Sequence, residues 1–188
     1  RQKALNSVIR IFYMYINWNT FYNGIMIALW RFAMVELREI TKDNYEECLK
    51  LTVADNQKNF VSSTVLSLAQ AWVYYDTAFP FAIYADDTMV GFIMLGYYEA
   101  KNQYTLWKFM IDERYQNRGY GRTALKLGMQ YLVDRFQVKE VYTAYESSNR
   151  IARDLYASFG FVETGEVAGH DVEMKCVLDD TNAVLYIK

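Results

Sequence analysis

Hydrophobic and polar residues follow two regular spacings along the chain from Val35 to Leu178. Short runs that are apolar, or that alternate with polar residues, predict strands. Longer runs with apolar residues three and four positions apart predict helices. The predicted strands cover residues 35–40, 79–84, 89–98, 104–111, 140–145, 161–167 and 170–178. The predicted helices cover residues 45–54, 62–75, 119–136 and 149–159.

This order of elements predicts one domain of the α/β (α+β) class, in which helices pack on a mixed, mostly antiparallel sheet. The run Asp86–Thr88 predicts a hairpin turn between two neighbouring strands. No repeat, linker or low-complexity run interrupts the pattern after residue 33. In the helix over 62–75, the spacing predicts an apolar face made of Val65, Leu68, Ala69 and Trp72.

Residues 1–33 differ in composition from the rest of the chain. They contain four basic residues and no acidic one, and 20 uncharged residues separate Arg10 from Arg31. That length could just span a membrane, but polar residues within it weaken this interpretation, and no signal-peptide cleavage site follows. The favoured interpretation is an extra segment outside the core, followed by a domain over 34–178 and a tail over 179–188. A membrane anchor and a packing or dimerising helix are the alternatives.

The composition is that of a folded domain, with 53% hydrophobic and 17% aromatic residues. The formal net charge is −2. Four of the 20 basic residues and none of the 22 acidic ones lie in residues 1–33, so the remainder has 16 against 22 and a net charge of −6. An acidic body argues against nucleic acid as the main partner. Cys48, Cys176 and the single His170 are isolated, so we predict no metal site, no disulfide framework and a reducing, cytoplasmic location.

The run Phe109–Leu125 joins a predicted strand to a predicted helix through a loop that contains Gly119 and Gly121. The first amides of a helix lack intrahelical partners and carry the positive end of the helix dipole, and glycines let the backbone approach a phosphate. The loop lacks the Gly-Lys-Ser/Thr of a nucleoside triphosphate site and the third glycine of a dinucleotide site. A phosphate-binding loop and a plain tight turn both fit the run. Three arginines add positive charge: Arg114, Arg118 and Arg122.

Two motifs extend this interpretation. The run Gln116–Gly121 (QNRGYG) has the form Gln/Arg-x-x-Gly-x-Gly/Ala, and a second pattern lies downstream at Asn149, Ala152, Tyr156, Gly160 and Phe161. In this order and spacing the motifs resemble those of the GCN5-related N-acetyltransferase (GNAT) family, and most of all its bacterial spermine/spermidine (diamine) acetyltransferases. The resemblance implies a mostly antiparallel sheet of about six to seven strands with helices on both faces. It also implies acetyl-CoA as co-substrate.

The resemblance implies roles for individual residues. The backbone of Met110 and Ile111 would contact pantetheine, and Tyr156 would act as general acid to the leaving thiolate. Asn149 would bind the coenzyme and cap the following helix. Core packing explains Met110, Ile111 and Tyr156 equally, and capping alone explains Asn149. The implied pyrophosphate loop consists of Gln116, Asn117, Arg118, Gly119, Tyr120, Gly121 and Arg122, whose arginines could instead form a solvated face. Asn117 stands where the family often has glycine, and asparagine tolerates left-handed dihedrals.

The acceptor side is less defined by sequence. The strand run Leu106–Met110 (LWKFM) contains no acid, so Glu146, at the end of the next strand, is the candidate base or ammonium anchor, and water could also take the proton. Aromatic and acidic side chains suit a polyamine such as spermidine or spermine. The expected function is direct acetyl transfer to a polyamine by a homodimer or larger oligomer. The alternatives are another amine acceptor (aminoglycoside, amino acid or protein N-terminus) and a non-catalytic acyl-CoA sensor. Other candidate residues are Asp55, Asp76, Glu99, Tyr74, Tyr75, Tyr97 and Tyr98.

Overall fold

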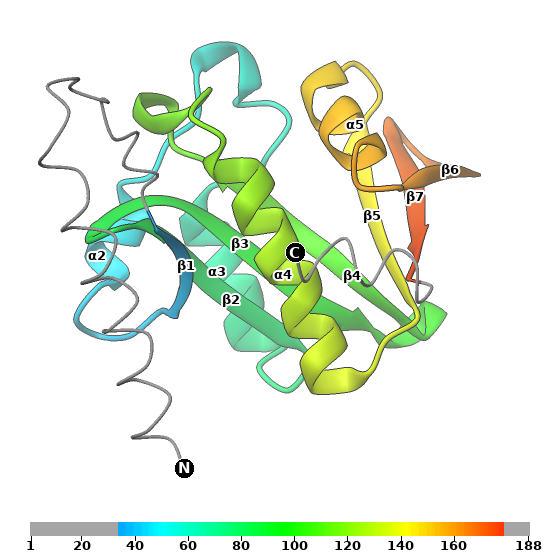
Figure 1. Ribbon diagram of the computed structural model, residues 1–188, viewed down its shortest axis with the longest axis horizontal. Helices are drawn as coiled ribbons and strands as arrows, with labels where there is room; N and C mark the ends of the chain where they lie inside the picture. Colours follow the sequence, from blue (N-terminus) through cyan, green and yellow to red (C-terminus); the bar gives the residue numbers. More distant parts are fainter. Residues whose placement is uncertain (1–33, 179–188) are drawn as a thin grey trace, which may run out of the picture. The chain divides into compact units, whose positions relative to one another are not determined.

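The computed structural model describes residues 34–178, which lie in the unit Ala33–Lys188 of the chain (Figure 1). Within these residues a seven-stranded sheet has the order β1-β2-β3-β4-β5-β7-β6. The strands are β1 Val35–Glu39, β2 Ala78–Ala85, β3 Thr88–Tyr98, β4 Gln103–Ile111, β5 Glu140–Glu146, β6 Val162–Ala168 and β7 Asp171–Val177. The helices are α2 Tyr45–Leu49, α3 Thr64–Val73, α4 Tyr120–Phe136 and α5 Arg150–Ala157. Three short 3-10 helices are η1 Asp55–Gln57, η2 Glu99–Lys101 and η3 Glu113–Tyr115.

The predicted fold class is confirmed: the sheet is mixed and mostly antiparallel. Every neighbouring pair of strands between residues 34 and 178 is antiparallel except β4 and β5. A parallel pair needs a crossover connection, and α4 supplies it. Between the end of β4 at Ile111 and the start of α4 at Tyr120 the chain forms η3 and the predicted phosphate loop, so this loop lies at the carboxyl end of β4.

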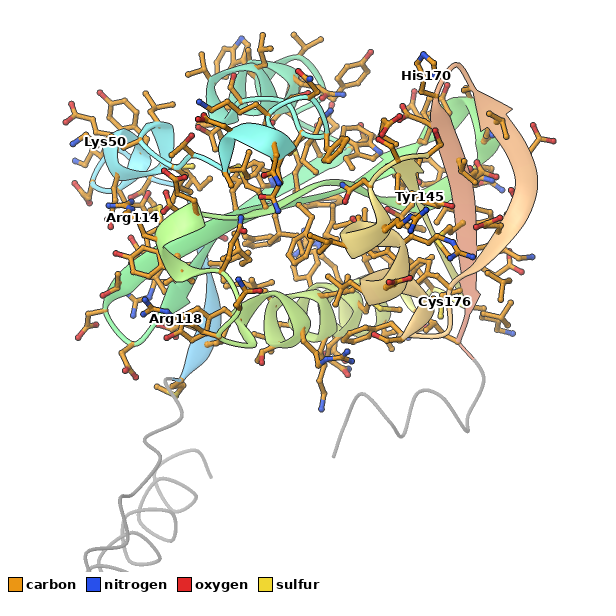
Figure 2. The ribbon with its side chains drawn as sticks, turned by 90° about the horizontal axis from the view of Figure 1, so that it is seen from above. Lys50, Arg114, Arg118, Tyr145, His170 and Cys176 are labelled. Atoms are coloured by element: carbon orange, nitrogen blue, oxygen red, sulfur yellow. The ribbon has the colours of Figure 1, made fainter. Side chains whose placement is uncertain are left out.

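Helices cover both faces of the sheet, as predicted. Figure 2 shows the sheet between two helical layers, with α2 and α3 on one side and α4 and α5 on the other. One buried cluster includes Leu125, Met129 and Leu132 of α4, and a second includes Cys48 and Ala71 of α2 and α3. The sheet therefore forms the middle layer, with a core on each face.

Gly128 sets how closely α4 packs on the sheet. A Cβ at this position would lie 2.7 Å from Cδ1 of Ile93 on β3. A larger residue would require the Ile93 side chain to move. Glycine therefore suits the close packing of α4 on β3 at this point.

The predicted boundary of the first helix was wrong at its carboxyl end. The helix ends at Leu49 rather than at residue 54. The main-chain N–H of Thr52 donates to Oδ2 of Asp112 at 3.1 Å, and its carbonyl accepts from the N–H of Glu113 at 2.9 Å. These distant partners take the backbone groups that a helix would have used, so tertiary contacts override the local pattern.

The predicted face of the second helix was right at Leu68, which packs against the second buried cluster, and wrong at Val65 and Trp72. Val65 is 56% exposed and Trp72 is 82% exposed, whereas the buried residues of α3 are Thr64, Ser67 and Ala71. The Ser67 hydroxyl donates to the Ser63 carbonyl at 2.9 Å, so its polarity is satisfied within the helix. Small side chains on this face let α3 approach the sheet.

The interpretations of residues 1–33 and of the tail over 179–188 concern parts of the chain outside the described residues. Between residues 34 and 178, no helix combines the length and the apolarity that crossing a membrane requires.

Candidate active site

The candidate site is built where β4 and β5 separate. The two strands pair only at Thr105 with Tyr142 and at Leu106 with Thr143, among the residues described. Beyond these pairs β4 continues to Ile111 and β5 to Glu146. The facing edges of the two strands therefore present main-chain N–H and C=O groups that the sheet itself does not pair. A cleft of about 1370 Å³ opens along them.

A β-bulge in β4 directs side chains toward this cleft. Lys108 pairs with Met94 and Leu106 pairs with Leu95, so Trp107 has no counterpart on β3. The Trp107 ring lies against Gly96, where an added Cβ would come within 2.5 Å of Cε2 of the indole. Both Trp107 and Lys108 line the cleft.

The loop after β4 leaves the first amides of α4 without a side-chain cap. Asn117 and Gly119 both have left-handed backbones, with φ of 62° and 82°. Gly119 occupies the N-cap position and has no side chain to accept from the following N–H groups. Uncapped amides and the positive end of the dipole of a 17-residue helix favour an anion at this place. The left-handed Asn117 agrees with the tolerance expected of asparagine at this position.

Side chains of the loop are engaged mainly in holding its shape. Nε2 of Gln116 donates to the Ile111 carbonyl at 2.9 Å and to Oε1 of Gln57 at 2.7 Å. The Arg118 guanidinium donates to the Arg114 carbonyl at 3.0 Å. Arg122 lies 5.4 Å from the ring centroid of Phe159. The main-chain amides are thus the groups best placed to hold a phosphate.

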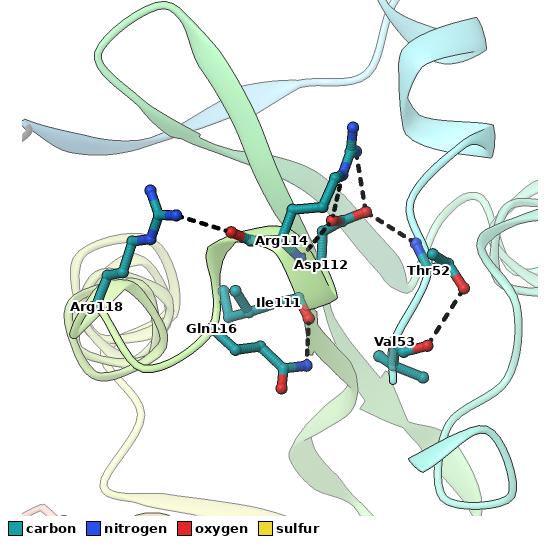
Figure 3. A network of polar contacts seen from close by, with 7 residues as sticks. All are labelled: Thr52, Val53, Ile111, Asp112, Arg114, Gln116 and Arg118. Carbon is teal, nitrogen blue, oxygen red and sulfur yellow. Dashed lines mark hydrogen bonds and ion pairs between the residues drawn. The ribbon is translucent and has the colours of Figure 1, made fainter. Parts of the chain in front are cut away.

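Asp112 connects the loop after β4 to the segment that follows α2 (Figure 3). Its side chain is fully buried, and it accepts from Nε of Arg114 at 2.7 Å and from the N–H of Thr52 at 3.1 Å. Burial acts to raise the pKa of Asp112, but the hydrogen bonds from Arg114 and Thr52 outweigh it and lower the pKa. Asp112 therefore stays ionised and fastens the residues after α2 to the end of β4.

Sequence reasoning missed this role of Asp112. The sequence pattern ends the strand at Ile111 and predicts positive charge at Arg114, but it assigns no role to Asp112. An aspartate directly after a strand, with a 3-10 turn following, is a common cap, and the Asp112 side chain does accept from the N–H of Arg114 at 3.0 Å. That local signal could have been recognised from sequence, whereas the contact with Thr52 could not.

Gly119 offers a direct test of the anion site. We expect Gly119→Ala to weaken acetyl-CoA binding about tenfold, because a Cβ strains the left-handed backbone and shifts the amides that follow. Isothermal titration calorimetry would measure the effect. Gly165→Ala is the matched control, since Gly165 also has a left-handed φ of 89° and open space around it, and it lies outside the cleft. Equal coenzyme affinity in both variants would contradict the prediction.

Tyr156 lies in the cleft wall on α5. Only 6% of the residue is exposed, and its ring packs against Phe161 with centroids 5.8 Å apart. Burial raises the pKa of Tyr156 to about 12, although a hydrogen bond with the Thr143 side chain acts in the opposite direction. The phenol is therefore protonated at neutral pH and can donate a proton.

Glu146 and Asn149 lie at the cleft end of β5 and the start of α5. The Glu146 carboxylate accepts from the hydroxyl and the N–H of Ser148, the latter at 2.9 Å. Hydrogen bonding by the Ser148 hydroxyl is the largest cause that lowers the pKa of Glu146. A lowered pKa makes Glu146 a weak base but suits an anchor for an ammonium group. Oδ1 of Asn149 accepts from the N–H of Ala152 at 3.1 Å, which leaves its amide N–H groups for another partner.

Most of the sequence-predicted site residues meet in this cleft. Those that line it are Met110, Ile111, Gln116, Asn117, Gly119, Tyr120, Gly121, Arg122, Glu146, Asn149 and Tyr156. Arg118 does not line it, and neither do Asp55, Asp76 and Tyr75 among the acceptor candidates. Asp55 forms an exposed ion pair with Lys58. Residues that the sequence pattern did not single out also line it, including Trp107, Lys108, Val53, Ala54, Asn56, Gln57 and residues 59–62.

With this geometry in view, the chain was compared with known proteins. The sequence model of the Acetyltransferase (GNAT) family matches residues 34–161. The chain belongs to this family. The GNAT match includes β4, the loop after it, α4 and α5, and so it spans the elements that build the cleft. As a GNAT acetyltransferase, the protein is an acyltransferase enzyme.

The relatives and structural neighbours agree with this assignment. The chain is 34% identical over 141 residues to a spermine/spermidine N(1)-acetyltransferase of Bacillus subtilis (strain 168), which covers 71% of this chain and 91% of that protein. A spermidine N-acetyltransferase from Vibrio cholerae, solved with CoA and spermine, superposes with a TM-score of 0.63 at 16% identity. That match covers 82% of this chain and 98% of the other. A PaiA N-acetyltransferase from Thermoplasma acidophilum, solved with coenzyme A, gives 0.60 at 17% identity over 77% and 99% of the two chains.

Proposed function

We propose that the protein transfers the acetyl group of acetyl-CoA to an amine of a polyamine such as spermidine or spermine. The main observation that supports this proposal is a single cleft lined by three features: the uncapped start of α4, the open edge of β4 and an aromatic, partly acidic wall. The names of the Bacillus subtilis relatives, at 34% and 33% identity, support the polyamine as acceptor.

In this proposal the coenzyme lies along the open edge of β4. The main-chain amides over 117–122 hold the pyrophosphate at the positive end of α4. The backbone of Met110 and Ile111 pairs with pantetheine, and the free amide N–H groups of Asn149 donate to the coenzyme. Gln116 contributes indirectly, since its side chain holds the Ile111 carbonyl and the loop together.

The acceptor enters from the side of α3. The rings of Tyr74 and Trp107 meet edge to face with centroids 5.8 Å apart, and Tyr98 and Glu99 also line the cleft. Aromatic faces attract alkylammonium groups, and methylenes pack on them. Glu146 anchors one ammonium group of the acceptor.

The chemistry is a direct attack. The neutral amine nitrogen forms a bond to the thioester carbonyl carbon, and the carbon–sulfur bond breaks. The thiolate takes the phenol proton of Tyr156, which regains a proton from solvent, while the amine nitrogen loses one proton to solvent. Cys48 and Cys176 are both buried and outside the cleft, so the proposal includes no acyl-enzyme. We further propose that the acetyltransferase domain spans residues 34–178, that residues 1–33 are an additional segment, and that the protein acts in the cytoplasm.

Steady-state kinetics with an amine panel would test the acceptor class. We expect kcat/KM for spermidine and spermine to exceed that for an aminoglycoside, an amino acid and short peptides. Each additional ammonium group meets the aromatic and acidic wall, and one such contact contributes roughly 0.5–2 kcal/mol. Faster acetylation of a peptide or an aminoglycoside would contradict the proposed polyamine acceptor and leave the acetyltransferase assignment intact. Fast turnover of putrescine alone would restrict the acceptors to diamines.

A further inference from the structure

Lys108 is the charged residue of β4, and its side chain lies in the cleft. Its ammonium donates to Oγ of Ser62 at 3.2 Å. Within residues 34–178, no carboxylate oxygen lies within the 4.0 Å of an ion pair from this ammonium. A partly buried cation without a counterion raises the local positive potential. The roles described so far for the site give no function to this charge.

The position of Lys108 places this charge where acetyl transfer would occur. It follows the bulged Trp107 and lies beyond Leu106, the last residue of β4 that pairs with β5. The side chain thus projects from the start of the open edge. It also faces the segment before α3, through Ser62, which is the side from which the acceptor enters in our proposed function.

A nearby cation changes the protonation of an amine. An alkylammonium such as a lysine side chain has an ordinary pKa of about 10.4, so only about one amine in a few thousand is neutral at pH 7. A like charge at roughly 5 Å in a partly solvated cleft lowers that pKa by on the order of one unit. Each such unit makes the neutral, nucleophilic form tenfold more abundant.

We propose that Lys108 keeps the attacking amine of the acceptor in its neutral form, in the place where a carboxylate base would otherwise be needed. This inference rests on the proposed function. The displaced proton goes to solvent before attack, so no group of the protein has to accept it. The cost is weaker binding of a polycation, because the same charge repels every protonated amine in its range.

Other charged and titratable groups around the cleft do not perform this task. Glu146 is bound to its own turn and has a lowered pKa, and Tyr156 is kept neutral by burial. Arg122, the other cation in the wall, lies against the Phe159 ring at the phosphate end. The other titratable groups that line the cleft are Tyr74, Tyr97, Tyr98, Glu99, Tyr115, Tyr120, Tyr145 and Asp171.

Three variants of the full chain separate charge from structure: Lys108→Met removes the charge, Lys108→Arg keeps it, and Ser62→Ala removes only the hydrogen-bond partner. The readout is kcat against pH at saturating spermidine, because kcat reports groups in the bound complex. For Lys108→Met we expect the rising part of the kcat–pH curve to shift to higher pH by about one unit, so that kcat at pH 7 falls about tenfold. The maximal kcat at high pH should stay unchanged. We expect KM for spermidine to fall severalfold. Lys108→Arg and Ser62→Ala should keep the wild-type profile.

Several results would overturn the inference. An unshifted rising limb in Lys108→Met would show that the charge does not act on the amine. A higher KM for spermidine would show that Lys108 helps to bind the acceptor instead of repelling it. A shift in Ser62→Ala equal to that in Lys108→Met would assign the effect to the position of the segment before α3. Either result, with spermidine still acetylated, contradicts the inference and leaves the proposed function in place.

A second measurement does not depend on turnover. NMR titration of ¹³C-labelled spermidine bound with CoA would report the pKa of the bound amine directly. We expect it about one unit lower in the wild-type protein than in Lys108→Met. Equal values would contradict the inference. If spermidine neither reacts nor binds, the proposed function fails and the inference fails with it.

Discussion

Replacing Tyr156 by phenylalanine is expected to lower kcat at least a hundredfold while the affinity for acetyl-CoA stays within about twofold. A positioned general acid contributes roughly 10²–10⁴ to rate, and phenylalanine keeps the ring that packs against Phe161. The variant therefore loses the proton donor for the leaving thiolate but keeps the packing of the ring. Steady-state kinetics and calorimetric titration with acetyl-CoA would separate the two effects.

Tyr131→Phe is the control for this prediction. Tyr131 lies on α4 outside the cleft, and burial raises its pKa also, so both variants remove a partly buried phenol. Because the pKa of Tyr156 is raised to about 12, kcat of the wild-type enzyme should not fall between pH 8 and pH 10, as it would for an ordinary tyrosine acid. Full activity of Tyr156→Phe would remove Tyr156 from the mechanism.

Replacing Asp112 by alanine is expected to reduce the free energy of unfolding by about 3 kcal/mol. The carboxylate is fully buried, and its loss leaves the N–H groups of Thr52 and Arg114 without their acceptor. The Arg114 guanidinium is 60% exposed and can return to water, so the backbone groups account for most of the cost. Urea denaturation followed by circular dichroism would measure it.

The same carboxylate gives the stability a defined pH dependence. Its folded pKa is lowered, so its contribution is fully present above the unfolded value of about 3.9 and is lost as the pH falls through the folded value. The difference in free energy of unfolding between wild type and Asp112→Ala should therefore be constant near neutral pH and become smaller below about pH 4. Asp87→Ala, which removes a fully exposed carboxylate from its ion pair with Arg38, should change stability far less than Asp112→Ala. Equal stability of the two variants would contradict this role for Asp112.

The coenzyme side of the site could be predicted from the sequence because its signals are local. A strand, a loop with Gly119 and a helix follow one another in about twenty residues, and backbone dihedrals there depend on the residues themselves. The second motif around Tyr156 is equally local. In the structure, residues of both motifs line one cleft.

The acceptor side could not be predicted in the same way because its geometry depends on distant contacts. The bulge at Trp107 exists only in the register of β4 against β3. The early end of α2 depends on the contact of Thr52 with Asp112, 60 residues away in sequence. The buried face of α3 consists of small residues such as Ser67 and Ala71, which hydrophobic spacing ranks below the exposed Trp72.

The most direct test of the account is to incubate the full chain with acetyl-CoA and spermidine and to measure free thiol and N-acetylspermidine together. The account predicts that both appear in equal amounts and that neither forms when the amine is omitted. Tight binding of acetyl-CoA without release of free thiol, whichever amine of the panel is added, would contradict the proposed acetyl transfer. That result would leave a GNAT fold that binds the coenzyme without using it for catalysis.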